Sequence, residues 1–206
     1  MLRHDLARQV LVCNGMNAID LLKQQHREVE QLFAKLEKTD DVSARAGLFR
    51  ELASKLVGHD GIEREIFYPA CEEKMGLSDQ LGEALVEHGV IEFSLYECDQ
   101  ALKDDDFKFK VTVLKELVQH HVKEEEQEFF PQVEKAFEAE ELDDLAEELD
   151  EAFEDALSED YHEPLFENLR QVLAGTLKPV SPEEEAADED ERTSIKQRRA
   201  RGRRSA

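Results

Sequence analysis

A short helical turn that occurs twice in the chain sets the strongest limit on how the protein folds. His59 and Glu63 form the first copy, and His121 and Glu125 form the second. Residues four apart lie on one face of an α-helix, so each copy directs an imidazole and a carboxylate towards the same place. Each turn therefore predicts half of a metal site.

The repeat extends beyond these two turns. The offset between His59 and His121 also relates His26 to His88, and it relates two aromatic–proline pairs, Tyr68-Pro69 and Phe130-Pro131. Apolar residues recur at steps of three and four, which predicts helices at about 16–38, 44–74, 79–103 and 107–139. Two similar helical hairpins then stack, and the expected fold class is all-α, an up-down-up-down four-helix bundle.

The ligand turns continue the buried faces of their helices. An apolar residue stands seven positions before each histidine and glutamate of the two turns, namely Leu52, Leu56, Leu114 and Val118. Gly58 and Gly61 flank the first turn, and since a helical glycine costs about 1 kcal/mol, they predict close packing of a neighbouring helix. Pro69 lacks a backbone donor and is expected to kink or loosen the last turns of its helix.

The chain divides into an N-terminal extension, the bundle, a helical extension and a charged tail, at residues 1–15, 16–139, 140–178 and 179–206. An acidic amphipathic helix at 140–158 and a shorter segment after Pro164 are expected to pack on the outside of the bundle. The tail has no apolar pattern, and we expect it to be disordered. Met16 begins a better helix than the residues before it, so a translation start there stays open.

Composition limits the partners. The formal charge is −24, and no apolar run approaches the ~20 residues of a membrane span, so we expect a cytoplasmic protein without a membrane partner. We expect no contact with nucleic acid except through the basic stretch between Lys196 and Arg204, and for this stretch a solvated tail is the preferred interpretation. The three cysteines lie far apart without a C-x-x-C pair, which argues against a disulfide framework or an iron–sulfur motif.

Six side chains on the core faces would each cost several kcal/mol to bury without partners, and a cation satisfies them together. Imidazole and carboxylate without thiolate suit Fe, Mn or Zn, and six donors exceed the four of a closed zinc site. Two metal ions that share the glutamates fit the number of six donor side chains best. They leave open coordination positions for a small ligand. The predicted metal ligands are His26, His59, Glu63, His88, His121 and Glu125.

These residues resemble the hemerythrin-like (HHE, cation-binding) domains over about residues 16–135. The family pattern is a His on the first and third helices and His-x-x-x-Glu on the second and fourth, and both even helices here also end in the family's aromatic–proline pair. The resemblance implies a non-haem diiron centre, with two Fe ions bridged by oxo or hydroxo and carboxylate groups.

One position departs from the oxygen-carrying members. The oxygen carriers of invertebrates place a fifth histidine four residues after the third-helix histidine, where this chain has Glu92, and the counterpart of Glu92 on the first helix is Glu30. Both glutamates are expected to be additional ligands or groups that surround the ligands. The site then resembles bacterial domains linked to iron–sulfur repair or to nitric oxide and oxygen response, and reversible oxygen carriage is disfavoured. His120, rotated by about 100° from His121 on the helix, is expected at the surface or behind the ligands.

We therefore expect a diiron metal-binding protein that senses, binds or detoxifies oxygen, nitric oxide or peroxide, as in a stress response, and that is a sensor more than a dedicated enzyme. One alternative is a diiron oxidoreductase that reduces peroxide or nitric oxide and needs an electron donor. Another is an iron-storage protein or an iron donor to an apo-iron protein, although the Glu-x-x-His pairs of ferritin-like sites are absent. A structural zinc or an empty bundle is the remaining alternative.

Overall fold

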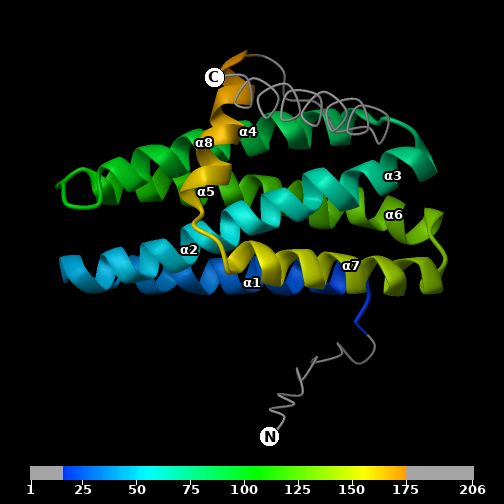
Figure 1. Ribbon diagram of the computed structural model, residues 1–206, viewed down its shortest axis with the longest axis horizontal. Helices are drawn as coiled ribbons and strands as arrows, with labels where there is room; N and C mark the ends of the chain where they lie inside the picture. Colours follow the sequence, from blue (N-terminus) through cyan, green and yellow to red (C-terminus); the bar gives the residue numbers. More distant parts are fainter. Residues whose placement is uncertain (1–15, 175–206) are drawn as a thin grey trace, which may run out of the picture.

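The computed structural model describes residues 16–174, and the expectations for residues 1–15 and 175–206 lie outside this part of the chain. The bundle consists of α1 (Ala18–Leu36), α2 (Val42–Ile62), α4 (Asp79–Gln100) and α5 (Phe107–Glu124) (Figure 1). Residues 16–174 contain no β-strand, which confirms the predicted all-α class. None of their helices combines the length and the apolar character needed to cross a membrane.

Three of the bundle helices begin at a side-chain cap. Each cap lies where a polar stretch ends and the periodic pattern of apolar residues begins. The side chain of Asn17 accepts a hydrogen bond from the amide of Asp20, that of Asp41 from Ala44, and that of Ser78 from Leu81. Such caps satisfy amide groups that the first turn leaves without an intrahelical partner, and each stabilises its helix by about 1 kcal/mol. The starts of α1, α2 and α4 are thus determined locally.

Both ligand turns run into a π-helical segment. The segments η1 (Glu63–Phe67) and η2 (Glu125–Phe129) join α2 to α3 (Tyr68–Met75) and α5 to α6 (Phe130–Ala136). The amides of Tyr68 and Phe130 donate to the carbonyls five residues earlier, those of Glu63 and Glu125. A proline then lies in the first turn of α3 and of α6, where its missing N–H costs nothing.

These segments modify the expectation for Pro69. We predicted one continuous helix to about residue 74 whose last turns are loosened, but the change in pitch begins at Glu63 itself. The periodicity of three and four continues through the segment and does not reveal it. The wider turn rotates Tyr68 and Phe130 towards the middle of the bundle, and π-helical turns are frequent at functional sites.

Two apolar clusters fill the interior on either side of the bundle's midpoint. One contains Phe33, Leu52 and Leu114, and the other contains Phe67, Leu81 and Phe130, and all six side chains are buried. The four apolar residues predicted to lead into the ligand turns are buried as well. A polar layer between these clusters is therefore shielded from water in both directions along the bundle axis.

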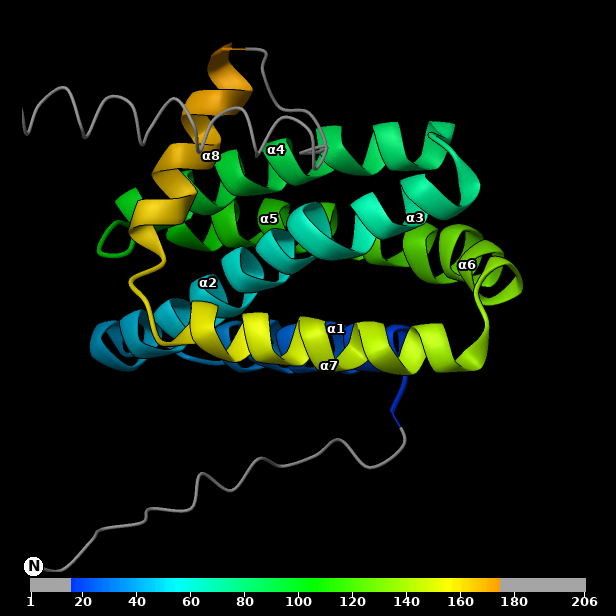
Figure 2. The ribbon, with the colours of Figure 1, turned by 45° about the vertical axis from the view of Figure 1, so that its right-hand side comes forward.

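The extension packs outside the bundle, as expected. Helix α7 (Ala139–Leu157) lies along α1 and α2, and α8 (His162–Ala174) crosses α4 (Figure 2). A Cβ atom on Gly58 would lie 3.3 Å from the ring of Phe153 in α7, so close packing explains this glycine. At Gly61 the same prediction is wrong, because within residues 16–174 no atom apart from those of the adjoining residues and the local helix backbone would lie within 4 Å of an added Cβ.

The contrast between these two glycines predicts opposite effects of an added methyl group. Gly61→Ala should raise the free energy of unfolding by about 1 kcal/mol, because alanine favours the helix and meets open space. Gly58→Ala should give less stability than Gly61→Ala, because the ring of Phe153 must move to admit it. Urea unfolding of the metal-free proteins measures both, and equal midpoints for the two variants would contradict this packing.

Candidate metal centre

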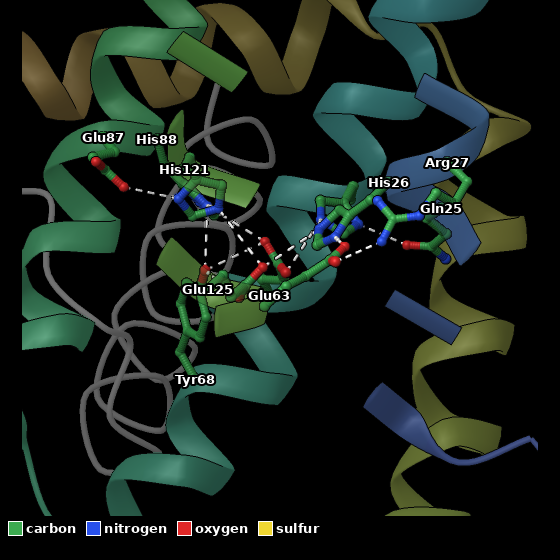
Figure 3. Close-up of polar contacts among 11 residues, drawn as sticks. Gln25, His26, Arg27, Glu63, Tyr68, Glu87, His88, His121 and Glu125 are labelled. Atoms are coloured by element: carbon green, nitrogen blue, oxygen red, sulfur yellow. Dashed lines mark hydrogen bonds and ion pairs between the residues drawn. The ribbon is translucent and has the colours of Figure 1, made fainter. Parts of the chain in front are cut away.

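The six predicted ligands meet in the polar layer at the middle of the bundle. The structure brings together His26 from α1, His59 from α2, His88 from α4 and His121 from α5, with one glutamate at the start of each π segment. All six side chains are buried, and Glu63 is fully so. Figure 3 shows the two carboxylates between the histidines of the first hairpin and those of the second.

The donor atoms form two pairs with the glutamates between them. The Nε2 atoms of His26 and His59 are 3.0 Å apart, as are those of His88 and His121. Glu63 lies between the pairs, with Oε1 3.1 Å from His59 Nε2 and Oε2 3.4 Å from His88 Nε2. Ligand bonds of about 2.1 Å place neighbouring donors about 3.0 to 3.4 Å apart around one ion. The spacing fits one cation per histidine pair.

Glu125 mirrors Glu63. Its Oε2 lies 3.4 Å from His26 Nε2 and 3.9 Å from His121 Nε2, so it also lies between a histidine of each hairpin. Within the described residues, Glu63 Oε1 and Glu125 Oε2 have no hydrogen-bond donor, although both atoms are buried. A buried carboxylate oxygen without a donor is costly. A cation at each histidine pair would satisfy both oxygens.

An acceptor behind each imidazole directs its lone pair inwards. Every Nδ1 atom faces a side-chain oxygen: Glu126 for His26 at 2.9 Å, Gln25 for His59 at 2.7 Å, Asp60 for His88 at 2.6 Å and Glu87 for His121 at 2.9 Å. In the neutral rings Nδ1 then carries the proton and Nε2 carries the lone pair. Two lone pairs that face each other at 3.0 Å repel, and a cation between them removes this repulsion. Such outer partners are typical of histidines that bind metals.

Tyr68 adds a hydroxyl group to the centre. It donates to Glu125 Oε1 at 3.1 Å, and its oxygen lies 3.4 Å from Glu63 Oε2 and 3.3 Å from His88 Nε2. Burial, together with the charges of the two carboxylates, raises the pKa of Tyr68 well above its ordinary value, so the phenol keeps its proton. Its counterpart in the repeat, Phe130, has no hydroxyl and stacks on the His26 ring instead, at 6.1 Å between centroids.

Protons compete with metal cations for the donor atoms of the centre. Burial alone would lower the pKa of His26, but the adjacent carboxylates of Glu125 and Glu126 outweigh it and raise this pKa to about 9. Burial and the charge of Glu125 raise the pKa of Glu63. His59 is different, since burial and the charge of His26 lower its pKa to about 3. Without metal, the centre therefore holds protons near neutral pH.

The two further candidates, Glu30 and Glu92, lie outside the cluster of six. Glu30 is exposed on α1. Glu92 is buried, but it accepts a hydrogen bond from Asn168 of α8, and burial and the charge of Asp60 raise its pKa to about 9. Asn168 contacts both Glu92 and Asp60, the partner of His88. Glu92 belongs to neither group of potential donor atoms at the centre.

Sequence reasoning missed the four outer partners of the histidines. Gln25 and Glu87 were detectable, because each directly precedes a histidine of the repeat and each contacts the histidine of the next helix. Asp60 and Glu126 left no such signal. At the repeat offset, their counterparts are Val122 and Arg64, neither of which could accept a proton from a histidine.

A small cavity adjoins the centre. Its volume is about 30 Å³, and the four histidines, Asp60 and Glu92 line it together with seven aliphatic side chains: Val29, Leu56, Val57, Ile91, Leu95, Val118 and Val122. This is room for a water or a diatomic molecule. A groove of about 290 Å³ between α1 and α5 shares His26, Val29, Val118 and Val122 with the cavity. The shared residues separate the centre from solvent on this side.

The pKa values predict how cation binding depends on pH. Near pH 7 a divalent cation must displace a proton from His26, whose pKa is about 9, and from Glu63, whose pKa is raised. Affinity should therefore rise with pH up to about 9, by about tenfold per pH unit for each displaced proton. Zn²⁺ titrations at pH 6 and pH 8, in two buffers of different ionisation enthalpy, measure the affinity and the protons released. Equal affinities at both values would contradict this account.

Comparisons with known proteins agree with the geometry. The family model of the hemerythrin HHE cation binding domain matches residues 17–133. A crystal structure of a hemerythrin HHE cation binding domain-containing protein from Mycobacterium kansasii is 22% identical, with a TM-score of 0.62, and the match covers 74% of this chain and 99% of that one. A DNA nickase from Nostoc sp. is 27% identical over 117 residues, which are 56% of this chain and 33% of the nickase. Because the family model covers more than half of its length and all six clustered residues, this chain belongs to the hemerythrin HHE cation-binding family.

Proposed function

We propose that this protein holds two iron ions and binds oxygen, nitric oxide or peroxide at them, as a sensor or scavenger. His26 and His59 would hold one ion, His88 and His121 would hold the other, and Glu63 and Glu125 would contact both. The observation that carries the proposal is the pair of 3.0 Å distances between Nε2 atoms, with a shared carboxylate between the pairs. When bound, two such ions supply redox activity and open positions for a small ligand.

The chain's own residues suit such a ligand. The small, mostly aliphatic cavity has room for a diatomic molecule and excludes larger ones by its size. Tyr68 keeps its proton and can donate a hydrogen bond within the centre. Hydrogen-bond acceptors behind Nδ1 of His26, His59 and His121 favour one tautomer of these rings, and Asp60 lies 2.6 Å from Nδ1 of His88, so the donor set is organised before a ligand arrives.

The activity named for the Nostoc relative is not part of this proposal. The chain spans about a third of the length of that protein. Its formal charge of −24 would repel the phosphates of DNA, which nucleic-acid-binding proteins neutralise with basic residues.

Metal content tests the ligand set. Protein purified without added metal should contain about two irons per chain, because the two histidine pairs form two sites. The double variant His59→Ala, His121→Ala should contain almost none, since it removes one donor from each pair. His162→Ala is the matched control, because His162 lies on α8, away from the centre, and pairs with Asp99 and Asp160. Zinc in place of iron, or unchanged iron in the double variant, would overturn the proposal.

A substitution at the cavity tests ligand access. Val118→Phe should fill the cavity and the inner end of the groove, and it should slow nitric oxide binding to the reduced protein by tenfold or more, with the iron content unchanged. Val118→Ala is the control and should leave the rate unchanged or increase it, because it widens the same passage. Stopped-flow absorbance measures both rates. If the phenylalanine variant binds at the normal rate, ligands reach the centre by another path.

A further inference from the structure

Helix α5 carries a second His-x-x-x-Glu pair that the buried centre does not use. His120 and Glu124 directly precede His121 and Glu125, so the two pairs are rotated by about 100° from each other on the helix. The His120 side chain is 61% exposed, as expected from the sequence. Glu87 reaches the same place from α4, and the donor atoms of Glu87, His120 and Glu124 all lie within 4.8 Å of one another.

One nitrogen of His120 lies close to both carboxylates. Nε2 of His120 lies 3.4 Å from Glu87 Oε1 and 3.3 Å from Glu124 Oε1. Both distances are longer than a good hydrogen bond. They match the spacing of about 3.4 Å between donors that surround one tetrahedral ion at about 2.1 Å.

A second histidine outside the buried centre, His162, contacts two carboxylates in an arrangement that does not suit a single ion. His162 also lies between two carboxylates, but its Nδ1 is 2.6 Å from Asp160 and its Nε2 is 3.5 Å from Asp99. The two ring nitrogens point in different directions, so no single ion can contact both carboxylates and the ring. Of these two histidines, His120 is the one that offers a single nitrogen to two carboxylates.

The arrangement belongs to the second hairpin alone. At the repeat offset, the counterparts of Glu87, His120 and Glu124 are Gln25, Gly58 and Ile62, which together supply no carboxylate or imidazole. In the first hairpin Phe153 of α7 also covers the position of Gly58. The bundle geometry therefore does not require these three residues, and the face they occupy is open.

Glu87 links this surface to the buried centre. Its Oε2 lies 2.9 Å from Nδ1 of His121 and accepts a hydrogen bond from it, while Oε1 faces His120. One carboxylate thus has one oxygen on each site.

From this convergence we propose that Glu87, His120 and Glu124 form a third, solvent-facing site for a divalent cation such as Zn²⁺ or Fe²⁺. The three side chains supply one nitrogen and at least two oxygens, and water completes the coordination. Because fewer protein donors hold the ion and the site is exposed, it binds more weakly than the buried pair of sites. The proposal does not depend on which metal occupies the buried centre.

Calorimetric titration of the metal-free full chain with Zn²⁺ tests this site. Wild type should bind one more Zn²⁺ per chain than His120→Ala, and the missing event should be the weakest one. Glu124→Gln should weaken the same event by tenfold or more, while His162→Ala should retain it. Circular dichroism confirms that each variant is folded.

Comparing wild type with the variants tests the outer site independently of the buried centre. Equal numbers of bound Zn²⁺ in wild type and His120→Ala would overturn the outer site, and so would loss of the weak event in His162→Ala. If the tight events are absent from wild type and variants alike, the buried centre fails, while the difference of one ion still reports on the outer site.

Discussion

In the interior of this bundle, the Nε2 atoms of two imidazoles face each other at 3.0 Å in each of two histidine pairs, and the surrounding structure holds them there. Neutral rings in this position present lone pair to lone pair, which is unfavourable without a positive charge between them. Both apolar clusters end at this layer, so the nitrogens lie in a largely apolar interior. The helices, the caps and the outer acceptors thus maintain an arrangement that is stable only with protons or metal ions at its centre.

The two hairpins surround their histidines with different partners, although their sequences repeat. Gln25 and Glu87 support the imidazole of the next helix in matching positions. The other two acceptors, Asp60 and Glu126, reach across between the hairpins and have no counterparts. Tyr68 brings a hydroxyl to the centre where the second hairpin has Phe130. The two halves of the centre therefore differ chemically, and Asn168 of α8 adds to the difference because it contacts both Asp60 and Glu92.

The sequence alone was sufficient for the parts of the structure that depend on local spacing. Residues four apart share a helix face, so the repeated His-x-x-x-Glu turns predicted both the bundle and the six donors that meet in it. Spacing could not reveal the π segments, because the apolar period passes through them unchanged. It could not place Asp60 against His88 or Asn168 against Glu92 either, since those contacts depend on how the hairpins and α8 stack. The expectation for Gly61 failed for the same reason, because only the position of α7 decides which glycine is covered.

The central claim is the proposal that each histidine pair holds one iron ion and that the two ions share the two glutamates. Crystals of the protein as purified, measured just above and just below the iron absorption edge, test it most directly. The account predicts two anomalous peaks per chain, one beside Nε2 of His26 and His59 and one beside Nε2 of His88 and His121, with Glu63 and Glu125 in contact with both. A single peak, or signal at the zinc edge alone, would contradict it.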